Sequence, residues 1–97
     1  MVLGWFDTRA VVAFANETSR EIQTALPPTE ESRRVRPDKR MKRLERVINK
    51  TKAFGKENKL NFYKRAQFAN TLKWSLKEAG YPDEFIRDLV GLVIVSL

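Results

Sequence analysis

Lysine and arginine dominate residues 32–52, where ten of them stand against two acids. Eight of these cations follow an Arg-rich segment and the polar side of the helix expected after it, and we call them the basic ridge. They are Arg33, Arg34, Arg36, Lys39, Lys42, Arg43, Arg46 and Lys50. Cations gathered on one side of a helix can neutralise the phosphates of a nucleic acid or another polyanion. The alternative is that they form only the solvated back of an amphipathic helix.

The charge of the chain is unevenly distributed. The net charge is +7, yet residues 33–77 carry sixteen bases and three acids, while the two flanking segments each carry a net charge of −3. Along the basic ridge only Asp38 and Lys42 form a favourable i,i+4 pair, and close like charges cost on the order of a few tenths of a kcal/mol per pair. This imbalance favours an anionic partner, contacted through phosphates rather than base edges, and leaves DNA or RNA open.

A second group of residues could contact unpaired bases. It forms a stripe on the helix expected at 61–79, which we call the amide–aromatic stripe: Tyr63, Gln67, Asn70, Trp74 and Lys77. Aromatic rings interleaved with amides and a cation can stack on bases and hydrogen-bond to them. The alternative is a packing role at the edge of the core, because Tyr and Trp bury well with their polar tips at the rim.

Catalytic chemistry has little support in this chain. It contains no histidine and no cysteine, which removes the commonest general base and the commonest zinc ligands. Glu17 and Glu21 are one helical turn apart, but no further carboxylate joins them as a metal-binding set. The four glycines are isolated and form no phosphate-binding loop. We therefore expect a protein that is not an enzyme and has no metal and no cofactor.

Residues 75–89 have the outline of a DNA-reading helix-turn-helix, with Gly80 in the turn. The positions exposed on its second helix would be Asp83, Glu84, Arg87 and Asp88. Three of these four are acidic and would repel phosphates. Recognition of the major groove by this helix is therefore not expected.

The helical period predicts an all-α fold, a small bundle or orthogonal array of four helices at about 8–26, 38–54, 61–79 and 83–96. Asp7 and Asn61 are suitable N-caps, and Gly55 and Gly80 suitable stops. The third and fourth helices are expected to form a tight hairpin. Residues 1–97 should be a single domain in which 27–36, bounded by prolines, form a flexible loop.

Apolar stripes predict the core of this bundle. For the helix at 61–79 the predicted buried face is Phe62, Ala66, Ala69, Leu72, Leu76 and Ala79, and for the helix at 38–54 it is Met41, Leu44, Val47, Ile48, Thr51 and Phe54. Trp5 and Phe6 are expected to cover the N-terminal end of the bundle. The last helix is apolar on nearly every side, so it is expected to be deeply buried or shared with a partner. Its possible interface is Leu89, Leu92, Val93, Ile94, Val95 and Leu97.

These observations predict a non-enzymatic helical module that binds nucleic acid or another polyanion through the basic ridge. The alternative is a protein-interaction or homo-oligomerisation module that uses the apolar C-terminal helix. The N-terminus has no signal-peptide pattern, and the longest apolar run, residues 89–97, is too short to span a bilayer. A cytoplasmic location is expected.

Overall fold

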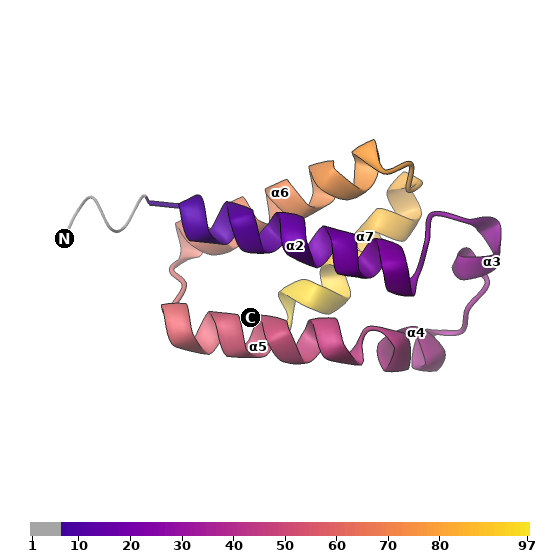
Figure 1. The fold of residues 1–97 in the computed structure, drawn as a ribbon, viewed down its shortest axis with the longest axis horizontal. Helices are drawn as coiled ribbons and strands as arrows, with labels where there is room; N and C mark the ends of the chain where they lie inside the picture. The colour runs from indigo at the N-terminus through magenta and orange to yellow at the C-terminus, as the bar shows by residue number, and fades with distance from the viewer. Residues whose placement is uncertain (1–6) are drawn as a thin grey trace.

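The computed structural model describes residues 7–97, which form helices and no strand (Figure 1). The helices are α2 (Arg9–Ala25), α3 (Glu30–Arg33), α4 (Pro37–Arg43), α5 (Glu45–Asn58), α6 (Phe62–Glu78) and α7 (Asp83–Ile94). The all-α fold is confirmed, but the count of four helices is wrong. A helical turn, α3, lies within the expected loop, and the helix expected at 38–54 is divided into α4 and α5. Trp5 and Phe6 lie outside the described residues.

The division between α4 and α5 falls at Leu44, a fully buried residue whose backbone leaves helical geometry (φ −94°, ψ 6°). Its N–H still donates to the Arg40 carbonyl, and its carbonyl accepts from the Ile48 N–H. The two helices therefore follow each other without an unsatisfied backbone group at this residue. α5 then continues past Gly55, which is not the expected stop, and ends at Lys59 in the left-handed conformation (φ 46°).

α2 and α6 pack together more extensively than any other pair of helices. Small residues at the contact, such as Ala15 and Ser19, are fully buried, which lets the helices approach closely. The Ser75 hydroxyl of α6 donates to the Ser19 hydroxyl of α2 at 2.8 Å. At the start of α2, the Asp7 carboxylate accepts from the Arg9 N–H, and the hydrogen bond from the Arg9 side chain lowers the pKa of Asp7 to about 2.

The helices α5 and α7 complete the core beneath this pair. α7 contacts both α6 and α5, and α5 also contacts α2 (Figure 1). Between α2 and α5, the rings of Phe14 and Phe54 stack with centroids 4.2 Å apart. The expected tight hairpin of α6 and α7 is therefore matched only in part, because α7 packs against α5 as well as against α6. None of the helices in residues 7–97 has the length and apolar character needed to cross a membrane.

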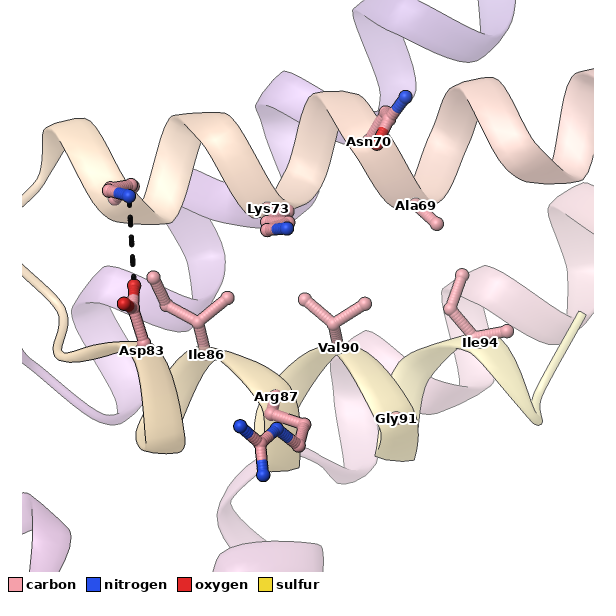
Figure 2. A pocket seen from close by; sticks show the side chains of 10 residues that line it. Ala69, Asn70, Lys73, Asp83, Ile86, Arg87, Val90, Gly91 and Ile94 are labelled. Carbon is pink, nitrogen blue, oxygen red and sulfur yellow. Dashed lines mark ion pairs between the residues drawn. The ribbon is translucent and has the colours of Figure 1, made fainter.

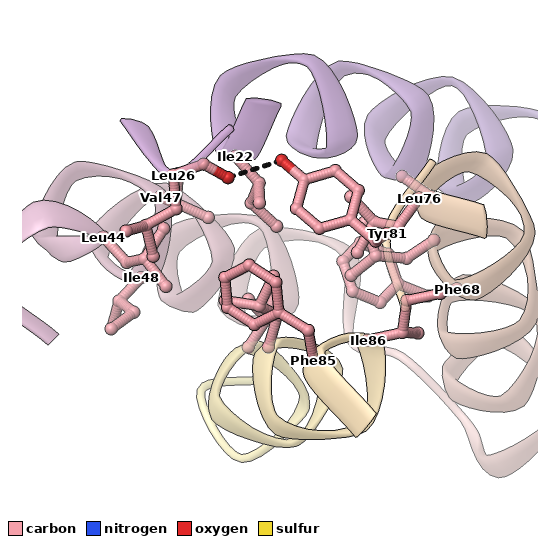
Figure 3. Packing of buried hydrophobic residues seen from close by; sticks show 14 of the residues in the cluster. Ile22, Leu26, Leu44, Val47, Ile48, Phe68, Leu76, Tyr81, Phe85 and Ile86 are labelled. Atoms are coloured by element: carbon pink, nitrogen blue, oxygen red, sulfur yellow. Dashed lines mark hydrogen bonds between the residues drawn. The ribbon is translucent and has the colours of Figure 1, made fainter. Parts of the chain in front are cut away.

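The buried face of α6 differs from the predicted one. Its fully buried residues are Phe68, Leu72 and Leu76, whereas Phe62 is 86% exposed and Ala66 is also exposed. Figure 3 shows Phe68 and Leu76 in a cluster with residues of α2, α5 and α7. The predicted stripe and the observed one share Leu72 and Leu76 and diverge toward the N-terminus of α6, where α7 and α2 select the face that Phe68 occupies. On α4, Met41 is likewise exposed rather than buried.

The connection between α6 and α7 is set by Gly80, which has φ +100° and follows the C-cap residue Ala79. The Tyr81 N–H donates to the Leu76 carbonyl and the Gly80 N–H to the Lys77 carbonyl, the bonding pattern of a Schellman motif. The motif turns the Tyr81 ring into the core, where its hydroxyl donates to the Leu26 carbonyl at 2.6 Å (Figure 3). The carbonyls at the end of α2 lack helical partners, and Tyr81 supplies one for Leu26.

Candidate polyanion-binding surface

The basic ridge is carried by α3, α4 and the first turns of α5. Thr29 caps α3 by accepting a hydrogen bond from the Ser32 N–H, and the buried Ser32 holds this turn against the rest of the molecule. Pro37 occupies the first turn of α4, where its missing N–H costs nothing. The Arg-rich segment is thus ordered into helical turns at its two ends.

Arg40 joins these elements, and the sequence analysis missed it. Its side chain is only 14% exposed, and one guanidinium nitrogen donates to the Arg33 carbonyl at 2.6 Å. The guanidinium also lies over the ring of Phe85, 5.0 Å from its centroid, and 3.5 Å from the carboxylate of Asp88. Its Nε is buried without a hydrogen-bond partner among residues 7–97. Arg40 therefore connects the end of α3 to α7 and positions the cations around it.

Five cations of the basic ridge are exposed and form no ion pair within residues 7–97. They are Arg33, Lys39, Lys42, Arg43 and Arg46. Two others have acidic neighbours: Arg34 lies 3.2 Å from Glu30 and Arg36 lies 3.9 Å from Asp38. Both pairs are solvent-exposed, so they are weak and compete poorly with a polyanion.

Lys50 does not belong with the exposed cations of the ridge. Its ammonium lies 2.6 Å from the Glu21 carboxylate and 4.0 Å from that of Glu17, both on α2. α5 packs against α2, and this contact directs Lys50 toward the two glutamates. The contact also gives the Glu17–Glu21 pair a structural partner. The described residues contain no group of three or more carboxylates that could hold a metal ion.

Arg43 and Arg46 form the centre of the ridge. Both line a shallow depression together with Lys42, Glu45, Asn49 and Lys50, so one acid lies among the cations there. Both also line a second, smaller depression between α5 and α2. Arg43 is the last residue of α4 and Arg46 the second of α5, so the interruption at Leu44 lies between them. The two side chains remain on a common surface although they belong to different helices.

The amide–aromatic stripe lies on the surface of α6. Trp74 is 56% exposed and Tyr63 is 43% exposed, so neither ring belongs to the core. Asn70 and Trp74 line a depression with Gln67, next to α2. The Lys77 ammonium lies 5.4 Å from the centroid of the Trp74 ring and 3.8 Å from the carboxylate of Asp83. Because Phe68 fills the core beneath them, these side chains are left available to solvent.

The apolar C-terminal helix is mostly absorbed by the core. Leu89 and Val93 are fully buried, so the structure excludes them from a surface interface. Leu92, Ile94 and Leu97 are half-buried and pack against the core cluster. Of the predicted interface residues, only Val95 is largely exposed, at 83%. An interface formed by this predicted set of residues alone would therefore be small.

The second helix of the helix-turn-helix outline presents the side chains that the sequence predicts. Asp83, Glu84, Arg87 and Asp88 are all exposed. The surface of α7 near its N-terminus is thus predominantly acidic and unsuited to phosphate contacts.

Comparison with protein-family models, with curated proteins and with solved structures finds no match to this chain. The surface is therefore interpreted from its own residues alone.

Proposed function

We propose that this protein is a small non-enzymatic helical module that binds nucleic acid, or another polyanion of similar charge density, through the basic ridge. The observation that carries the proposal is the group of five exposed cations on consecutive helices with no ion pair in the described chain. Charged side chains that serve only to solvate a helix are commonly mixed in sign, since i,i+4 pairs stabilise the helix.

The chemistry of the ridge suits phosphates better than bases. Arginine guanidinium groups form bidentate hydrogen bonds with phosphate oxygens, and lysine adds a point charge. Asn49 stands beside Arg46 in the same depression and is the one amide there that could contact a base edge. The expected binding is strong at low salt and weakly dependent on nucleotide sequence.

The number of exposed cations sets the expected salt dependence. Five phosphate contacts predict a slope of log K against log salt of about −4.5 for a duplex and about −3.5 for a single strand. A titration from low to physiological salt with one mixed-sequence duplex and one single strand measures both slopes. The absence of binding at low salt would reduce the ridge to a solvated helix surface.

A charge-reversal pair locates the binding surface. The double variant Arg43→Glu, Arg46→Glu should lose most of the nucleic-acid affinity at low salt. Its slope of log K against log salt on the duplex should flatten to about −2.7 or a smaller magnitude, since two of five contacts are removed. The matched control reverses Arg20 and Arg65, two exposed arginines on α2 and α6 that lie outside the ridge. Equal losses in the two variants would mean that only net charge matters, and an unchanged affinity in the first would refute the proposal.

A further inference from the structure

A groove of about 570 Å³ runs along the surface where α6 and α7 meet, on a part of the molecule that the basic ridge does not use. Figure 2 shows Ile86, Val90 and Ile94 pointing from α7 toward α6 along one side of the groove. Ala69 lies opposite them on α6, and its short side chain leaves the space open. The floor of the groove is therefore apolar and only partly covered.

The dimensions of the floor suit a helix. Ile86, Val90 and Ile94 recur every four residues, so they form one row of about 12 Å along α7. Ile86 is buried in the core at 3% exposure, and Val90 and Ile94 are the members of the row that a partner can reach. A groove with such a row accommodates the apolar face of an amphipathic helix, whose contacts recur at i, i+3, i+4 and i+7. Two to three helical turns of a partner would cover it.

The charges around the groove select an acidic partner. Lys73 and Lys77 line its α6 side, and Arg87 lies at the outer edge of α7. The only acid among the lining residues is Asp83, which is 3.8 Å from the Lys77 ammonium. A second copy of this chain would bring its own net charge of +7 to a surface that is already cationic, which disfavours self-association.

Gly91 is the second feature that indicates an occupant. Glycine inside a helix is destabilising relative to alanine, so its presence calls for a reason. Among residues 7–97 no neighbour requires it, because a Cβ built on Gly91 would meet no atom of these residues within 4 Å. Gly91 lines the groove, where the missing side chain lets another chain approach the α7 backbone.

We propose that the α6–α7 groove binds an acidic amphipathic helix of a partner protein. Apolar side chains of that helix would lie on Val90 and Ile94, its closest backbone approach would be at Gly91, and its carboxylates would face Lys73 and Arg87. This binding is independent of the basic ridge, so the two proposals can succeed or fail separately.

The probe is a synthetic, fluorescently labelled peptide helix of about four turns, with leucine at i, i+3, i+4 and i+7 and glutamate at most other positions. Its comparison peptide has the same composition in scrambled order, which keeps the charge and removes the apolar face. Fluorescence anisotropy should show the patterned peptide binding at least tenfold more tightly than the scrambled one. Peptide affinity should be retained in the Arg43→Glu, Arg46→Glu protein, since that variant removes only attraction to the ridge.

Gly91→Leu is the decisive variant, because its Cβ would meet nothing within 4 Å among residues 7–97, its side chain would occupy the groove, and it replaces a poor helix former. It should weaken the binding of the patterned peptide at least tenfold, while the Tm stays equal or rises and the affinity for nucleic acid is unchanged. Lys73→Glu should weaken the peptide at least threefold, and Lys39→Glu, an exposed reversal on α4, should not. Unchanged peptide affinity in Gly91→Leu, or equal binding of the scrambled peptide, would overturn the proposal.

Two further outcomes assign the groove to another occupant. Sedimentation that shows dimers in the natural protein and monomers in Gly91→Leu would assign it to a second copy. Failure of the patterned peptide to bind at about 1 mM, together with binding to anionic vesicles that Gly91→Leu abolishes, would assign it to a lipid surface. Either result rejects an acidic helix as the partner.

Discussion

The hydrogen bond from the Tyr81 hydroxyl to the Leu26 carbonyl joins residues 55 positions apart, and Tyr81→Phe removes only that bond. Tyr81 is 3% exposed and Leu26 is fully buried, so water cannot readily replace the lost donor. An unsatisfied buried carbonyl costs about 1–3 kcal/mol, and no ring atom is lost. For a domain of this size, a loss of about 1.5 kcal/mol lowers the Tm by roughly 6–12 °C.

The pH dependence of stability tests the burial of the same hydroxyl, which is a separate property from its hydrogen bond. Burial raises the pKa of Tyr81 to about 12, against about 10 in an unfolded chain. As pH rises above 10 the unfolded state loses this proton first, so the natural protein loses stability that is fully present at lower pH. The loss approaches roughly 2–3 kcal/mol near pH 12, and Tyr81→Phe lacks it.

Urea denaturation followed by circular dichroism measures both effects. The difference between the natural protein and Tyr81→Phe should be about 1–3 kcal/mol at pH 7 and should narrow as pH rises from 10 toward 12. Thr24→Val is the control, since it removes an exposed hydroxyl that donates to the Arg20 carbonyl, and it should change stability by less than about 0.5 kcal/mol. A Tyr81→Phe protein as stable as the natural one at pH 7 would refute the role of this bond, and a constant difference at high pH would contradict the burial of the Tyr81 hydroxyl.

Two other predictions concern positions that the tertiary structure explains. A Cβ at Gly55 would lie 3.2 Å from the Leu97 carbonyl oxygen. Gly91→Ala, in open space, should raise the free energy of unfolding by about 0.5–1 kcal/mol in urea denaturation, and Gly55→Ala should not. Equal gains in stability for the two variants would contradict the contact between Gly55 and Leu97. Arg40→Lys should lower the free energy of unfolding by about 1–3 kcal/mol, because lysine cannot make both the hydrogen bond to the Arg33 carbonyl and the contact with the Phe85 ring. Arg43→Lys, on the same helix, should change it very little. Similar thermal midpoints for these two arginine variants would show that Arg40 joins nothing.

Local sequence signals predicted most of the helix ends in this protein. The helices expected at 8–26, 61–79 and 83–96 are observed as α2, α6 and α7 with ends that differ by at most two residues. Prolines, caps and a glycine act within one turn of where they stand, so they need no knowledge of the rest of the chain. Gly55 shows the limit of this approach, because the contact with Leu97 explains it and a helix stop does not.

The candidate site was only partly visible in the sequence. Residue types and spacing place the cations of the basic ridge on one surface, and their exposure follows from their charge. The sequence could not show that Lys50 turns toward Glu21, because that pair joins helices that are distant along the chain. Nor could it separate Arg40, which is 14% exposed and bound to the Arg33 carbonyl and the Phe85 ring, from the identical residue types around it.

The sequence by itself determined the all-α class, the residues at which most helices begin and end, and the basic character of the middle of the chain. Only the tertiary structure decided which face of α6 is buried, where α4 gives way to α5, and that α7 leaves a groove beside α6. The physical reason is that capping and periodicity act between residues a few positions apart. Burial and ion pairing depend on which helices become neighbours, and Phe68 and Lys50 meet their partners only when the bundle closes.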